Sequence, residues 1–133
     1  MNPYASPQAY RANAVLTATP EQLVVMLYDG AVRFLRQSET AMGEGAWSHA
    51  FEKLARGEAI IDELLATLNM DTGEIADRLQ SIYVFCKRTL IEARLQRSPD
   101  KIAHVIALFI DLREAWAKLA EQAAAAAPAE QHA

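Results

Sequence analysis

Hydrophobic residues recur at intervals of three and four positions along most of the chain, with polar residues between them. This spacing places the hydrophobic side chains on one face of an α-helix. Clusters of glycine, proline, serine and aspartate interrupt the pattern, and no segment shows the alternation of a half-buried strand. The pattern predicts four long helices, at about residues 20–42, 46–69, 72–97 and 99–122.

Two of the predicted helices begin with clear start signals. Thr19 can accept a hydrogen bond from the first turn, Pro20 suits the first helical position, and Gln22 stands where a capping box needs its partner. Ser98 and Pro99 repeat this chemistry before the last helix. Four helices joined by short polar breaks predict an all-α fold, an antiparallel up-down four-helix bundle.

The segment MLYDGAVRFL, residues 26–35, poses a question about Asp29 and Gly30. Asp-Gly between apolar runs is typical of a hairpin turn, but the flanking residues follow a helical pattern, so the pair is predicted to lie inside a helix. A glycine there costs about 1 kcal/mol relative to alanine. Gly30 therefore indicates a close approach, either by another helix of the protein or by a ligand segment.

The first of the four long helices carries two hydrophobic rows rather than one. The rows are Leu23, Leu27, Ala31, Phe34 and Ser38, and Val24, Tyr28, Val32 and Leu35. One buried seam needs a single row, so the surplus indicates a surface that binds an amphipathic segment of another protein.

The two ends of the chain lack this pattern. Residues 1–18 carry Tyr4 and Tyr10 and are predicted to form a flexible arm that can dock as a short helix. The Ala-rich residues 123–133 have nothing large to bury, and Pro128 is expected to stop a helix, which predicts a disordered tail. The bundle domain is thus expected over residues 1–122.

Composition and charge narrow the function. With 133 residues, 52% of them hydrophobic, the chain is long enough for one domain with its own core. Its net charge of -4 and scattered cations give no basic stripe for nucleic acid. No apolar segment is long enough for membrane insertion or typical of a secretory signal, which predicts a cytoplasmic protein. The single cysteine, Cys86, is expected to be a buried hydrophobic residue.

Catalytic and metal-binding patterns are missing from the sequence. None of His49, His104 and His132 has a glutamate three residues before it, as the di-iron bundles require. There is also no HExxH motif and no phosphate-binding loop. The sequence therefore predicts a binding protein without cofactor or metal, and no enzyme.

Three segments resemble the FliS family of flagellar secretion chaperones. They are NPYASPQAYRANAVLTATPEQLVVMLYDGAVRFL, GEIADRLQSIYVFCKRTLIEA and FIDLREAW. The resemblance implies a helical bundle that binds the disordered C-terminal segment of flagellin in the cytoplasm. It implies that the chaperone prevents premature polymerisation and aids delivery to the export gate of the flagellar type III apparatus, without nucleotide.

The resemblance and the hydrophobic rows together predict two sets of site residues. The arm residues Tyr4 and Tyr10 are expected to cover the groove or contact the export gate. The expected flagellin-binding residues are Leu23, Met26, Leu27, Tyr28, Asp29, Gly30, Phe34, Ile75, Leu79, Ile82 and Tyr83. Where the family often has Asp-Tyr-Met, this chain has Val84, Phe85 and Cys86, so a polar contact there is not carried over.

Two readings stay open at this point. In the alternative, the bundle is a structural adaptor whose extra hydrophobic rows form a homodimer and which has no export client. The chaperone reading expects a Tyr28→Asp plus Tyr83→Asp variant to keep its helical fold while losing affinity for flagellin.

Overall fold

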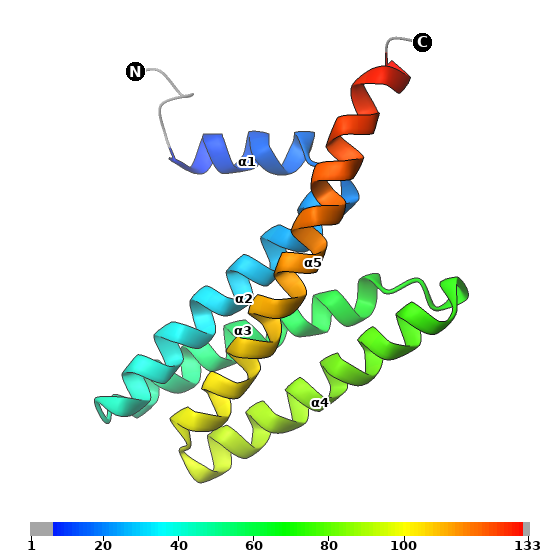
Figure 1. Cartoon of the computed structure of the whole chain (residues 1–133). Coiled ribbons are helices and arrows are strands. Elements are labelled where there is room, and N and C mark those ends of the chain that lie inside the picture. The colour runs from blue at the N-terminus through cyan, green and yellow to red at the C-terminus, as the bar shows by residue number, and fades with distance from the viewer. Residues whose placement is uncertain (1–6, 132–133) are drawn as a thin grey trace.

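The computed structural model describes residues 7–131, and side chains for residues 12–71 and 73–126 (Figure 1). All regular structure in this part of the chain is helical. The elements are α1 (Pro7–Thr17), α2 (Pro20–Gly43), α3 (Trp47–Thr67), the short 3-10 turn η2 (Met70–Thr72), α4 (Glu74–Gln96) and α5 (Pro99–Gln131). The predicted all-α bundle is confirmed, and α2, α3 and α4 begin and end within two residues of their predicted limits.

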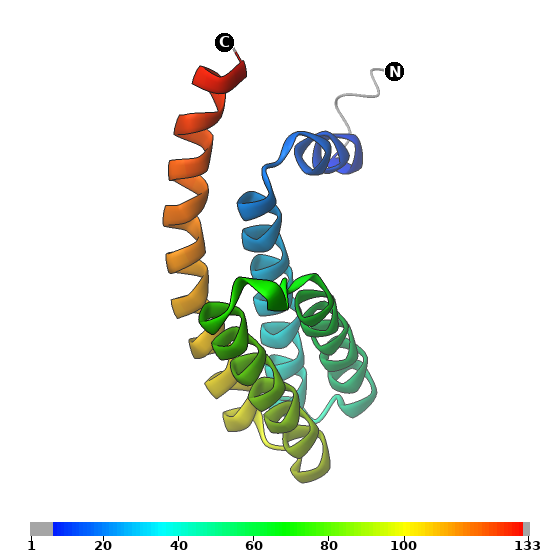
Figure 2. The same ribbon diagram turned by 90° about the vertical axis from the view of Figure 1, so that its right-hand side faces the viewer.

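The helices α2 to α5 run alternately up and down. Helix α2 packs along both α3 and α5, and α4 lies against α3 and α5 (Figure 2). The N-terminal end of α2 and the C-terminal end of α5 project beyond α3 and α4, and α1 leaves the bundle at this same end. Because α2 and α4 run in the same direction, the beginnings of both helices lie toward that end.

The two ends of the chain compare differently with the prediction. Residues 7–17 of the predicted arm form the short helix α1, a form that the prediction allowed. At the other end α5 continues through Pro128 to Gln131, where a disordered tail was expected. Alanine has the highest helix propensity, and adding residues to an existing helix avoids the cost of nucleation. The Ala-rich segment therefore extends α5 although it has no large side chain to bury.

The predicted start of α2 is confirmed. The Gln22 backbone N–H donates to the Thr19 hydroxyl at 3.2 Å, and the Thr19 N–H donates to the Gln22 side-chain oxygen at 2.9 Å. This reciprocal capping box, with Pro20 in the first turn, fixes where α2 begins.

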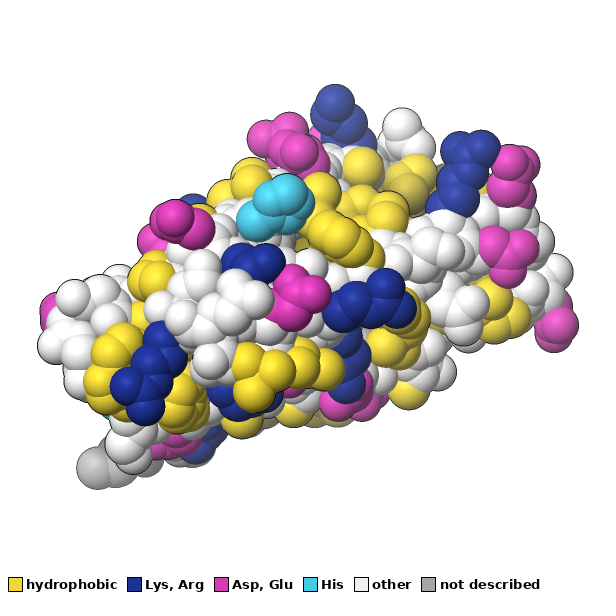
Figure 3. Space-filling view, turned by 90° about the horizontal axis from the view of Figure 1, so that it is seen from below, with side chains coloured by type: hydrophobic (Ala, Val, Ile, Leu, Met, Phe, Trp, Pro, Cys, Tyr) yellow, Lys and Arg dark blue, Asp and Glu magenta, His cyan; other side chains and the backbone are white. Residues whose placement is uncertain are grey.

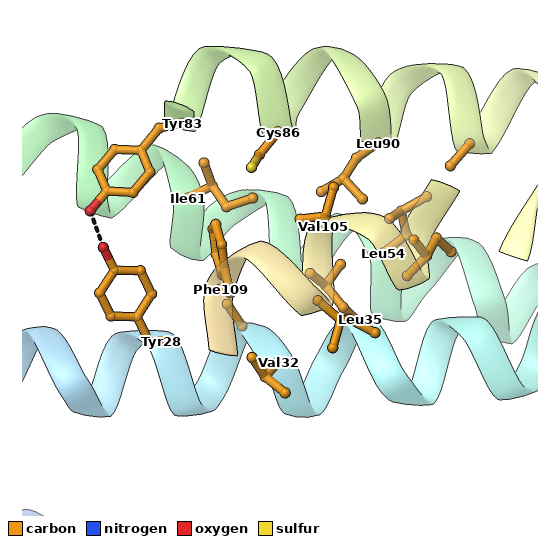
Figure 4. Packing of buried hydrophobic residues seen from close by; sticks show 14 of the residues in the cluster. Tyr28, Val32, Leu35, Leu54, Ile61, Tyr83, Cys86, Leu90, Val105 and Phe109 are labelled. Atoms are coloured by element: carbon orange, nitrogen blue, oxygen red, sulfur yellow. Dashed lines mark hydrogen bonds between the residues drawn. The ribbon is translucent and has the colours of Figure 1, made fainter. Parts of the chain in front are cut away.

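A single core runs between the four long helices (Figure 4). Cys86 is fully buried within it, as predicted. Large, fully buried members of the core are Tyr28 and Leu35 from α2, Leu54 and Ile61 from α3, Tyr83 and Leu90 from α4, and Ile102, Val105 and Phe109 from α5.

Both hydrophobic rows of α2 are largely used by its own neighbours. Residues of the first row meet α3: the Ser38 hydroxyl donates to the Ala50 carbonyl at 2.7 Å, and Lys53 lies over the Phe34 ring. The second row, with Tyr28 and Leu35, enters the core. Helix α2 needs both rows because it packs against helices on two sides. The hydrophobic surface of α2 that is left for a partner is therefore smaller than the sequence indicated.

Close packing of α2 on α3 explains the glycine in MLYDGAVRFL. Gly30 is buried, and a Cβ atom built on it would lie 3.1 Å from Cδ1 of Ile60. The close neighbour is therefore a helix of the same chain. Gly57 of α3 is more constrained, because a Cβ there would lie 2.7 Å from Cδ2 and 3.1 Å from Cγ of buried Leu35.

We expect Gly57→Ala to lower the free energy of unfolding by about 1–3 kcal/mol, because the added methyl group must displace Leu35 inside a packed core. Gly43→Ala is the matched control, since a Cβ there meets no atom within 4 Å. That control should leave stability unchanged or raise it by up to about 1 kcal/mol. Urea denaturation measures both, and equal stabilities of the two variants would contradict the packing argument.

Candidate functional site

An open, mostly apolar cleft lies between the beginnings of α2 and α4, the end of α3 and the middle of α5. Its volume is about 250 Å³. The lining residues are Val24, Leu64, Thr67, Leu68, Asn69, Ile75, Ala76, Leu79, Tyr83 and Trp116. None of these residues is charged. We call this hollow the apolar cleft.

The cleft exists because the bundle does not close at this end. Beyond Tyr28 and Tyr83 the next inward-facing residues, Val24 and Leu79, are only partly buried. At the rim, Ile75 is 73% exposed. These hydrophobic positions continue the core pattern of their helices without a partner helix to cover them.

A hydrogen bond between two tyrosines forms the floor of the cleft. The Tyr28 and Tyr83 hydroxyls are hydrogen-bonded to each other and lie at one end of the core, as Figure 4 shows. Both side chains are buried, with exposures of 0% and 1%. The edge of the Phe109 ring packs on both tyrosine rings, with centroids 5.3 and 6.3 Å away. Helical side chains lean toward the N-terminus of their helix, so both rings point toward the end of the bundle where the cleft opens. Of the two residues, only Tyr83 lines the cleft.

The groups at the floor are neutral. Burial raises the pKa of Tyr28 and Tyr83 above the usual 10.0, and for Tyr28 the hydrogen bond with Tyr83 adds to this rise. Burial also raises the pKa of the Cys86 thiol from 9.0 to about 12. Because the thiolate is the reactive form, Cys86 is unsuited to nucleophilic chemistry.

The structure brings only some of the predicted site residues to the cleft. Ile75, Leu79 and Tyr83 line it, and Tyr28 lies beneath. Leu27 and Ile82 pack against the core as partly buried residues. Gly30 faces α3, and Phe34 lies under the cations of Arg33, Lys53 and Arg56.

Three further predicted residues, Leu23, Met26 and Asp29, lie on exposed parts of α2. The Asp29 carboxylate pairs with the Arg113 guanidinium of α5 at 3.3 Å. Met26 and Asp29 border a wider hollow of about 600 Å³ between α1, α2 and α5, which Gln22, Glu121 and Arg113 make more polar than the apolar cleft.

The remaining two predicted residues belong to the arm. Tyr4 lies outside the described residues. Tyr10 lies in α1, but its side chain is outside the described part.

Sequence reasoning missed the contributions of α3 and α5 to the cleft. Leu64, Leu68 and Trp116 follow the same helical spacing as core residues, so their sequence pattern contains no sign that they end at an opening. The clue was indirect: Trp116 is a large amphipathic side chain near the end of the fourth hydrophobic stripe.

The lining of the cleft is suited to binding. Among the side chains that the structure describes, histidine, cysteine, aspartate and glutamate form no group of three or more that could hold a metal ion. None of the helices in the described part combines the length and apolar character of a membrane span. Positive and negative side chains are interspersed with hydrophobic patches on the face seen in Figure 3. An uncharged apolar cleft in a rigid bundle is suited to holding hydrophobic side chains of another polypeptide.

Comparison with known proteins agrees with a polypeptide-binding helical bundle. The family model described as "Flagellar protein FliS" matches residues 2–123. The flagellar secretion chaperone FliS of Bacillus subtilis is 34% identical over 115 residues, covering 86% of this chain and 84% of the relative. That of Salmonella typhimurium is 34% identical over 113 residues, covering 84% of each. The chain belongs to the FliS family.

A solved structure described as a flagellar chaperone from bacteria has the same fold. It superimposes with a TM-score of 0.74 at 21% identity, covering 86% of this chain and 97% of the other. The family assignment makes this protein a flagellar secretion chaperone with no enzymatic role.

The burial of both tyrosines changes the expected behaviour of the Tyr28→Asp plus Tyr83→Asp variant. We now expect the bundle to lose its cooperative fold, because two adjacent carboxylates would be buried without a cation. Circular dichroism with thermal melting measures this loss. A cooperative transition near that of the unsubstituted protein would contradict the structure.

Stability should fall as the pH rises above about 9. Since burial raises the folded-state pKa values of Cys86, Tyr28 and Tyr83, the folded protein keeps protons that the unfolded chain releases. Their contribution is complete below pH 9 and decreases above it, by on the order of 2 kcal/mol for Cys86 at pH 11. Urea denaturation from pH 7 to 11 tests this, and Cys86→Ala should flatten the decline.

Proposed function

We propose that this protein binds the disordered C-terminal segment of flagellin in the cytoplasm. Bound in this way, flagellin is kept from polymerising prematurely and is handed to the export gate of the flagellar type III apparatus. The apolar cleft is the observation that carries the proposal, because it offers uncovered hydrophobic surface next to a rigid core. The chaperone names of the relatives support the same role.

The physics of such a complex is favourable. Burial of apolar surface contributes about 25 cal/mol per Å² to binding. Because the cleft is already formed, only the client loses conformational entropy when it binds. A disordered segment can fold into helices as it binds, with its hydrophobic side chains hidden from water. Binding of this kind needs no nucleotide.

The arm supplies the second contact in this proposal. Helix α1 projects from the bundle with Val15 50% exposed and Leu16 82% exposed. Uncovered hydrophobic side chains on a projecting helix suit a contact with the export gate, together with Tyr4 and Tyr10.

A homodimer is the second candidate function, and one observation favours it. Val84, Ile91 and Leu95 are 43%, 47% and 78% exposed, and their spacings of seven and four place them on one stripe of α4 away from the core. Two such stripes, one from each copy, could pack together as a dimer interface. Light scattering over a range of concentrations distinguishes the adaptor from the flagellin chaperone, because a stable dimer would favour the adaptor.

The deciding experiment is isothermal titration of the protein with the C-terminal segment of flagellin from the same organism. We expect one-to-one binding, a negative heat-capacity change and a gain of helical circular dichroism on mixing. Absence of heat with both partners intact would reject the flagellin proposal.

A matched pair of variants locates the site. Ile75→Glu places a charge at the rim of the cleft and should weaken flagellin binding at least about tenfold, because a carboxylate there opposes apolar burial. Ile91→Glu makes the same substitution on the same helix outside the cleft and should leave affinity within about twofold. Equal effects of the two variants in the titration would move the client-binding surface elsewhere.

A further inference from the structure

The tyrosine pair at the floor of the apolar cleft has one hydroxyl proton more than its hydrogen bond uses. Each phenol contributes one proton, and the bond between Tyr28 and Tyr83 needs only one of the two. Within the described part of the chain, neither hydroxyl has a further hydrogen-bond acceptor. One O–H group is therefore left to donate elsewhere.

The surroundings decide which hydroxyl holds the spare proton. Tyr28 is completely buried and does not line the cleft, so a spare proton on it would have no acceptor. A buried donor without an acceptor is unfavourable. Tyr83 lines the cleft. The favoured arrangement has Tyr28 donating to Tyr83, and Tyr83 directing its own proton into the cleft.

We infer that the segment occupying the cleft presents a main-chain carbonyl to the Tyr83 hydroxyl, beside a hydrophobic side chain that fills the cleft. This inference rests on the proposed function, because it describes the part of the flagellin segment that enters. It makes Tyr83 a specificity-determining residue, whereas Tyr28 does not line the cleft and only supports its floor.

A carbonyl fits this site better than a carboxylate does. No lysine or arginine lines the cleft, so an ionised acceptor would be buried there without a counter-charge. The last four carbonyls of any helix have no partner within that helix. A segment that folds into short helices as it binds therefore brings unpaired carbonyls next to hydrophobic side chains.

Two single substitutions separate this role from a structural one. Tyr28→Phe and Tyr83→Phe each remove one hydroxyl of the same hydrogen bond, so both break the pair to the same degree. Of the two tyrosines only Tyr83 lines the cleft, so only Tyr83→Phe takes a hydroxyl away from a lining residue. If the pair served stability alone, the two variants would bind flagellin equally well.

The experiment is isothermal titration of the unsubstituted protein and both variants with the C-terminal segment of flagellin, together with urea denaturation of each. We expect Tyr83→Phe to bind about 5- to 30-fold more weakly, since a buried carbonyl loses its donor. We expect Tyr28→Phe to bind within about threefold of the unsubstituted protein. The two variants should be destabilised to a similar extent.

A double variant controls for the possibility that a single substitution weakens binding by destabilising the fold. Tyr28→Phe plus Tyr83→Phe removes both polar groups and leaves a wholly apolar floor, which is the better tolerated change in a core. It should bind as weakly as Tyr83→Phe. Equal affinities of the two single variants, or full affinity of the double variant, would overturn the inference while leaving the flagellin proposal intact. A failure of the unsubstituted protein to bind would reject the flagellin proposal itself.

Discussion

The hydrogen bond between Tyr28 and Tyr83 joins the two helices that run in the same direction through the bundle. It lies at the level where tight packing ends, with Phe109 of α5 against both rings. On one side of it, leucine and isoleucine side chains from all four helices fill the core. On the other side, hydrophobic positions continue without cover and form the apolar cleft. A polar contact thus closes the core while giving the cleft a floor that is fixed and uncharged.

Close contact between α2 and α3 provides the second constraint on the fold. Gly57 lets Leu35 reach the backbone of α3, and Gly30 leaves room for Ile60 in the opposite direction. The Ser38 hydroxyl adds a buried hydrogen bond to the carbonyl of Ala50. Since α2 is held so firmly, the residues that it contributes to the cleft are rigidly placed. A rigid binding surface leaves the entropic cost of folding to the disordered client.

The predicted site divides between several environments once the helices are assembled. Ile75, Leu79 and Tyr83 meet at the cleft, whereas Met26 and Asp29 face a separate hollow beside α5. Family resemblance could indicate that these positions matter, but it could not separate those that support the bundle from those that a partner can reach. Tyr28 illustrates the difference, because its side chain is buried and only its hydrogen-bond partner, Tyr83, lines the cleft.

The sequence by itself determined the four long helices, the capping box at Thr19, the burial of Cys86 and the family. These features follow from local spacing, capping chemistry and motifs, which are properties of residues close together in the chain. The tertiary structure decided that α2 uses both of its rows, that Leu68 and Trp116 border the cleft, and that Gly30 faces α3. Helical periodicity relates residues within one helix and contains no information on which neighbour covers each face. An opening in a bundle arises where neighbouring helices differ in extent, which only their assembly reveals.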